Sequence, residues 1–162
     1  MEFLNKLNVI LNKILLYISG LALVLMLFIG FGNMFLRSVW IPIKGSYEII
    51  GLLGALAAAL PLGFTQIRRS HIAVDIVTNK YPKKAQVLVD GISCLLNMIF
   101  FAIVSWRTAV WANIIRESGE LSETLRIAFY PFVYAVSVGF LLLSFSLLID
   151  TIKAFIEIRG KK

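Results

Sequence analysis

Charged residues, cysteine and histidine are scarce in this sequence. Only 15% of its 162 residues are charged and 59% are hydrophobic, and a soluble domain of that composition would lack polar surface. Cys94 is the single cysteine and His71 the single histidine, so neither an intramolecular disulfide nor a metal or bis-histidine haem site can form. The sequence also lacks a nucleophile–base set, a glycine-rich phosphate loop and a clear carboxylate pair. It therefore predicts a membrane protein that is not an enzyme and binds no cofactor.

The hydrophobic residues gather in four long runs. These runs cover residues 14–36, 49–67, 87–106 and 127–149, and Asp90 is the only charged residue inside them. Each run is long enough to cross about 30 Å of hydrocarbon as a helix, and lipid offers backbone polar groups no other partner. The first run is longer than a signal-peptide core and ends without a small-residue cleavage site. We expect an all-α membrane protein with four retained spans in a single domain, residues 1–162.

Lysine and arginine are distributed unequally between the two sides of these spans. An even number of spans leaves both termini on one side, together with eleven positive residues: Lys6, Lys13, Arg68, Arg69, Lys80, Lys83, Lys84, Lys153, Arg159, Lys161 and Lys162. The other side has five: Arg37, Lys44, Arg107, Arg116 and Arg126. The positive-inside rule then predicts cytoplasmic termini in a bacterial inner membrane. Basic residues beside apolar runs indicate contact with lipid head groups instead of nucleic acid.

Residues 71–81, between the second and third spans, are too few and too charged to cross the bilayer. Ile72 and Ile76 recur near helical spacing, and Pro82 ends the segment. Two structures fit this pattern, a short interfacial helix on the cytoplasmic surface and a solvated loop.

Two helix faces are candidates for close packing. In the second span, Gly51, Ala55, Ala59 and Gly63 recur every four residues, which lets another backbone approach closely, either from this chain or from a separate membrane subunit. Pro61 removes a backbone donor there and predicts a kink.

The third span carries Asp90, Ser93 and Asn97 on one face. These side chains predict interhelical hydrogen bonds, for which Asn33, Ser137 and Ser144 are candidate partners. A substrate pathway is the alternative, although few polar groups would line it. At the start of the second span, we expect Ser46 to be the N-cap and Glu48 to lie in the first turn; a proton-coupling role for Glu48 is the alternative.

A set of short motifs resembles one membrane-protein family. The motifs are Ser46-Tyr47-Glu48, Gly51-Leu52-Leu53-Gly54-Ala55, Arg68, His71-Ile72-Ala73-Val74-Asp75 and Tyr81-Pro82. Together with the length and the four spans, they resemble the small membrane subunit (DctQ-like, Q subunit) of tripartite ATP-independent periplasmic (TRAP) transporters. The resemblance assigns family-motif positions to Glu48, Arg68, His71, Asp75 and Pro82. Several members carry two carboxylates at the helix start, where this chain has only Glu48.

The resemblance implies a sodium-coupled transporter of organic anions. Its partners would be a large membrane subunit that works as an elevator, a periplasmic substrate-binding protein and membrane lipids. This chain would be an accessory subunit that stabilises the scaffold and binds neither substrate nor sodium. Arg37, Lys44, Arg107 and the acidic residues of the outer face are candidates for contact with the binding protein. The alternatives are a self-sufficient small exporter and a glutathione-using four-helix membrane enzyme.

Overall fold

The computed structural model describes residues 2–39, 41, 43–68 and 83–160, and the side chains of 2–4, 83–90 and 154–160 lie outside that description. Its helices are α1 (Glu2–Val39), α2 (Ser46–Ala59), α3 (Leu62–Ile67), α5 (Lys83–Ser118) and α6 (Tyr130–Gly160). The prediction of an all-α protein with four spans is confirmed, because Asn5–Val39, Ser46–Ile67, Gly91–Ser118 and Tyr130–Lys153 are helical segments long and apolar enough to cross a membrane. The interfacial helix considered for residues 71–81 lies outside the described residues.

The third span extends further than the hydrophobic run predicted. We expected it to end at Trp106, before Arg107, but α5 continues to Ser118. One charged side chain does not interrupt the backbone hydrogen bonding of a helix. Arg107 is exposed on α5, so it lies within the spanning helix and not in a loop.

Helix α1 buries polar and small residues and exposes large apolar ones. On α1, the buried residues include Asn8, Asn12, Ser19 and Ala22, while an exposed set covers its remaining surface: Ile14, Tyr17, Ile18, Leu21, Phe28 and Phe31. In water this arrangement would be unfavourable. In lipid it is favourable, because hydrocarbon solvates the large side chains while small residues let helices approach and polar ones find partners.

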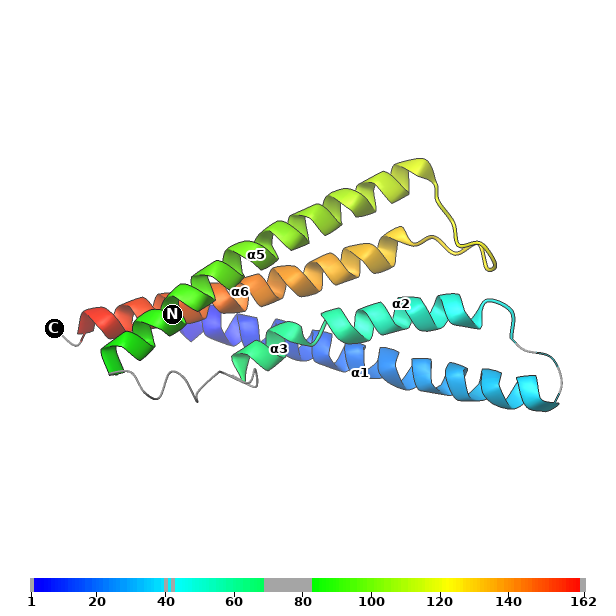
Figure 1. The fold of residues 1–162 in the computed structure, drawn as a ribbon, viewed down its shortest axis with the longest axis horizontal. Coiled ribbons are helices and arrows are strands. Elements are labelled where there is room, and N and C mark those ends of the chain that lie inside the picture. The colour runs from blue at the N-terminus through cyan, green and yellow to red at the C-terminus, as the bar shows by residue number, and fades with distance from the viewer. Residues whose placement is uncertain (1, 40, 42, 69–82, 161–162) are drawn as a thin grey trace.

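The helices form two antiparallel pairs, α1 with α2 and α5 with α6 (Figure 1). The pairs meet through α6, which contacts α1, α2 and α3 as well as α5. Figure 1 shows them close together at the end where α1 begins and α6 ends, and farther apart at the opposite end. We call these ends the terminal end and the loop end. The loop that follows α5 reaches across the loop end toward the start of α2.

A repeating set of contacts joins α5 to α6. Ser105 Oγ donates to the Ser137 carbonyl oxygen at 2.9 Å, and Ser137 Oγ donates to the Ser105 carbonyl oxygen at 2.8 Å. Seven residues along each helix, Ser144 Oγ donates to the Met98 carbonyl oxygen at 3.0 Å. Buried Ala112 continues the same spacing on α5. A seven-residue repeat is the period at which two helices coil around each other with one seam in contact.

The predicted break at Pro61 is confirmed. Helix α2 ends at Ala59 and α3 begins at Leu62, because proline has no N–H to continue the ladder. The Pro61 carbonyl oxygen still accepts from the backbone N–H groups of Phe64 and Thr65, at 3.0 and 3.1 Å. Helix α6 passes the break at Gly139, where an added Cβ would lie 2.8 Å from the Ala59 carbonyl oxygen. Only glycine allows this close approach of two backbones.

Candidate functional site

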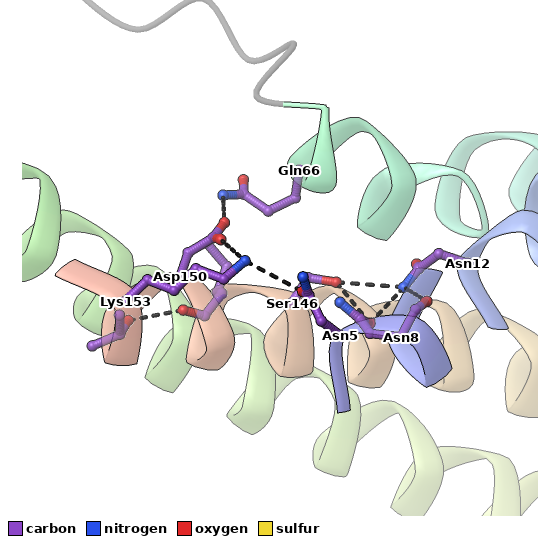
Figure 2. A network of polar contacts seen from close by, with 9 residues as sticks. Asn5, Asn8, Asn12, Gln66, Ser146, Asp150 and Lys153 are labelled. Atoms are coloured by element: carbon purple, nitrogen blue, oxygen red, sulfur yellow. Dashed lines mark hydrogen bonds and ion pairs between the residues drawn. The ribbon is translucent and has the colours of Figure 1, made fainter. Parts of the chain in front are cut away.

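Three buried side chains join α1 to α6 near the terminal end (Figure 2). Asn12 Nδ2 donates to the Asn8 carbonyl oxygen at 2.9 Å, to Asn8 Oδ1 at 2.8 Å and to Ser146 Oγ at 3.4 Å. Ser146 Oγ in turn donates to Asn8 Oδ1 at 3.2 Å and to the Leu142 carbonyl oxygen at 2.9 Å. Asn8 and Asn12 are 2% and 0% exposed. Polar groups shielded this completely need such partners, so the cluster fixes the register of α1 against α6.

A second group of polar residues extends this contact to α3. Gln66 Nε2 donates to Asp150 Oδ2 at 3.0 Å, and Lys153 Nζ lies 3.9 Å from Asp150 Oδ1 and 3.2 Å from Asn5 Oδ1. Figure 2 shows these residues continuing the line of Asn8, Asn12 and Ser146. The Lys153 side chain is 46% exposed, and a solvated ion pair of this kind contributes little stability. The group connects α3 to α6 and α6 to the start of α1.

Sequence reasoning missed both groups. Asn5, Asn8 and Asn12 precede the first apolar run, so the hydrophobic pattern alone places them outside the first span. Their spacing of three and four residues within one helix was the signal available.

The four small residues of the second span fall in two different environments. Gly63 and Ala59 are buried, and a Cβ on Gly63 would overlap Asn12 Oδ1 and lie 3.3 Å from the Leu143 backbone nitrogen. Asn12 Oδ1 has no hydrogen-bond donor among the described residues. By contrast, Gly51 and Ala55 are exposed, and nothing lies within 4 Å of a Cβ built on Gly51. The residues near the terminal end therefore pack inside this chain, whereas those near the loop end do not.

Glu48 connects the two helix pairs at the loop end. Its carboxylate accepts hydrogen bonds from Ser122 Oγ, from the Thr124 backbone N–H at 2.8 Å and from the Leu125 backbone N–H at 3.1 Å. Glu48 lies in the first turn of α2, as expected, and the three donors belong to the loop between α5 and α6. Hydrogen bonds to a charged group are stronger than neutral ones. This carboxylate thus holds the loop against α2.

The prediction that Ser46 caps α2 is wrong. Gly45 occupies the N-cap position with a left-handed φ of 74°, and no side chain caps the helix. Glycine adopts this φ without strain, and a Cβ there would overlap Leu125, which packs directly on Gly45. Ser46 is instead the first residue of the helix, and its buried Oγ has no partner among the described residues. The capping role was assigned from residue type alone, without the loop that covers this turn.

The predicted interhelical role of Asn97 within this chain is also wrong. Asn97 is exposed, and its Nδ2 donates to the Ser93 carbonyl oxygen of the same helix at 3.0 Å. The three candidate partners bond elsewhere: Asn33 Oδ1 accepts from the Ile43 backbone N–H at 2.9 Å, and Ser137 and Ser144 bond to Ser105 and Met98. Helix α5 turns another face toward α6, which the spacing of the polar residues could not reveal.

The remaining candidate positions are only partly described. The Arg68 guanidinium lies over the Phe64 ring, 5.0 Å from its centre, a favourable cation–π arrangement. His71, Asp75 and Pro82 lie outside the described residues, as does the side chain of Asp90. Among the side chains that the structure does describe, no three His, Cys, Asp or Glu residues are grouped so as to hold a metal ion.

The contacts described above hold the helices of this chain together. Comparison with known proteins identifies a family to which the chain is similar. A family model described as "Tripartite ATP-independent periplasmic transporters, DctQ component" matches residues 26–157. No curated protein and no solved structure matches the chain. The matched range covers most of the chain, including the Glu48 contact, the Pro61 break and the α5–α6 seam.

Proposed function

We propose a function for this chain on the premise that it belongs to the DctQ component family of tripartite ATP-independent periplasmic transporters, the family whose model matches residues 26–157. The family is a transporter component and not an enzyme family. Within such a system the chain serves as the small accessory membrane subunit. It packs on the scaffold of a large elevator subunit, which uses a sodium gradient to import an organic anion delivered by a periplasmic binding protein.

The main support for an accessory role is the use of polar groups inside the bundle. Asn8, Asn12, Ser105, Ser137 and Ser146 are buried, and each bonds to a neighbouring helix or a neighbouring turn. A permeation route through this chain would need polar groups directed into a water-filled space, usually beside interrupted helices. Here the five buried polar side chains named above are used in helix contacts, so the substrate route is assigned to the large subunit.

A scaffold must resist deformation while an elevator domain moves beside it. Three sets of contacts give this chain that property. The α5–α6 seam joins one pair along its length, the asparagine cluster fixes α1 to α6 at the terminal end, and Glu48 holds the loop after α5 against α2 at the loop end. With ties at both ends, tilting one pair relative to the other would break hydrogen bonds in the membrane.

The proposed orientation follows from charge. The side of the termini carries eleven positive residues, and the other side carries four once Arg107 is placed within α5, so we assign the terminal end to the cytoplasm of a bacterial inner membrane. The loop end, with Glu48 and the loop after α5, then faces the periplasm. It lies on the side from which the binding protein approaches.

Reconstitution in liposomes tests the proposal. The vesicles contain this chain and its large membrane partner, and the binding protein is added with the anion. An inward sodium gradient should drive accumulation of the organic anion in these vesicles, and accumulation should be lost when this chain is omitted. This chain alone should transport nothing. Transport by the chain alone, or full transport in its absence, would refute the accessory role.

Cysteine labelling tests the orientation. The single-cysteine variant Lys44→Cys, made in a Cys94→Ser background, should react with a membrane-impermeant thiol reagent added to the outside of intact cells. Lys13→Cys in the same background should not react.

A further inference from the structure

One face of α5 carries polar and aromatic residues that are exposed in the part of the chain that the structure describes. Ser93, Asn97, Phe100, Arg107 and Trp111 follow spacings of four, three, seven and four residues, which place them on a single helix face. All five are exposed, Phe100 and Trp111 to 58% and 57%. We call this set the α5 stripe. The buried seam residues Ser105 and Ala112 lie on a different face, toward α6.

The depth of Asn97 makes its exposure costly. The neighbouring residue Met98 is level with Ser144, because its carbonyl oxygen accepts from Ser144 Oγ. Ser144 lies within three residues of the middle of the span Tyr130–Lys153, so a helical rise of about 1.5 Å per residue puts Asn97 about 5 Å from the mid-level of the bundle. Its Nδ2 bonds to Ser93, and Oδ1 accepts nothing from the described residues. An amide exposed to hydrocarbon at this depth carries a desolvation penalty.

Arg107 lies in the same stripe and inside the span Gly91–Ser118. The sole ion pair in the part of the chain that the structure describes joins Lys153 to Asp150, so the Arg107 guanidinium has no carboxylate partner there. A charged side chain in a spanning segment normally faces a protein partner or a water-filled cavity. Its exposure, like that of Asn97, indicates a surface that is incomplete in the isolated chain.

Other exposed faces of the bundle differ from the α5 stripe. The exposed residues of α1 between positions 14 and 36 include no charged or amide side chain, and the exposed positions of α6 include Val138, Leu141 and Leu148. Those faces suit lipid. The α5 stripe instead combines arginine and tryptophan, which are enriched at protein interfaces, with an amide.

We propose that the α5 stripe is the surface through which this chain docks on the large membrane component of its transporter, an inference that rests on the proposed function. The occupant is a transmembrane helix of that component, with a hydrogen-bonding side chain opposite Asn97 and an acidic side chain opposite Arg107. Lipid tails supply neither group. A second copy of this chain is disfavoured, because a two-fold axis along the membrane normal would bring the two Arg107 side chains together at equal depth.

Site-specific photocrosslinking in the complete transporter tests the surface. A benzophenone side chain replaces Phe100 or Trp111 in the stripe, and Phe28 or Leu141 on the apolar faces as controls. Irradiation should join the two stripe variants to the large component, with much weaker adducts from the controls. Adducts from the controls but not the stripe would overturn the assigned surface and leave the accessory role intact. Adducts between two copies of this chain would overturn the assigned partner. Failure of the large component to co-purify with the unmodified chain would refute the proposed function itself, and this inference with it.

Matched substitutions measure the polar contribution. Asn97→Leu and Arg107→Leu are each expected to weaken binding of the large component in nanodiscs by roughly 3- to 20-fold, the range that interhelical polar contacts of about 0.6 to 1.7 kcal/mol produce. Asn97→Gln and Arg107→Lys should retain most of the affinity. Both leucine variants should keep the helical content and unfolding midpoint of the isolated chain, because the stripe lies away from the α6 seam. Unchanged or tighter binding by both leucine variants would show that the stripe faces lipid.

Discussion

The contrast between Gly63 and Gly51 gives the sharpest test of the packing described here. Both glycines belong to the same four-residue repeat, yet a Cβ at Gly63 would overlap Asn12 Oδ1 and a Cβ at Gly51 would meet nothing within 4 Å. The Asn12 carboxamide cannot easily rotate away, because its Nδ2 is held by Asn8 at 2.8 and 2.9 Å. The same Gly→Ala change should therefore destabilise the chain at Gly63 but not at Gly51.

The magnitude follows from two opposing contributions. Alanine stabilises a helix by about 0.5–1 kcal/mol relative to glycine, and overpacking a filled site costs about 1–3 kcal/mol. Gly63→Ala should then lower the free energy of unfolding by about 1 kcal/mol, and by at most about 2.5 kcal/mol. Gly51→Ala should leave it unchanged or raise it by up to about 1 kcal/mol.

The assay is reversible unfolding of the purified chain in mixed detergent micelles, followed by circular dichroism. A second variant identifies the overlapping atom: in an Asn12→Ala background the Oδ1 atom is absent, so Gly63→Ala should cost much less than it does in the native chain. If Gly63→Ala and Gly51→Ala were equally stable, or if Asn12→Ala did not reduce the cost, the close contact between α1 and α3 would be refuted.

Two further substitutions probe the remaining contacts. Ala59→Leu should lower the free energy of unfolding of the isolated chain by about 1–3 kcal/mol through overpacking, since Ala59 is buried against α6, whereas exposed Ala55→Leu should not change it; equal effects in the same titration would count against the arrangement. Glu48→Gln removes the negative charge of the carboxylate that accepts a hydrogen bond from the Thr124 backbone N–H. Hydrogen exchange at the Thr124 amide should therefore accelerate. The control substitution Glu117→Gln, at an exposed position, should leave this exchange rate unchanged. Unaltered exchange in Glu48→Gln would mean that the loop is held by other contacts.

The sequence was sufficient to predict the four spans and their helical structure. Long apolar runs must become helices in lipid, and that requirement does not depend on which helix lies beside which. The break at Pro61 was predictable for the same reason, because the missing N–H is a local property. The end of the third span was not, because Arg107 interrupts the hydrophobic run without interrupting the helix.

The sequence was not sufficient to predict which face of each helix packs against its neighbours. Asn97 and Ser105 both stand out as polar residues in one span, but only Ser105 meets α6, because the rotation of α5 is set by its neighbour. The small residues of the second span divided in the same way, with Gly63 inside and Gly51 outside. The burial of Asn8 and Asn12 could not be predicted from the apolar run, because α1 begins at Glu2, well before that run starts.

The inverted distribution of side chains on α1 also bears on how the sequence can change over generations. Large side chains such as Leu21 and Phe28 are exposed on the surface of the bundle. Other large apolar residues should therefore replace them at little cost in stability. Asn8, Asn12 and Ala22 have no such freedom, because each occupies a shape-restricted interior. A mutational scan of this helix should therefore show the reverse of the pattern found in a water-soluble protein. Substitutions should be tolerated at its largest residues and should be destabilising at its smallest and most polar residues.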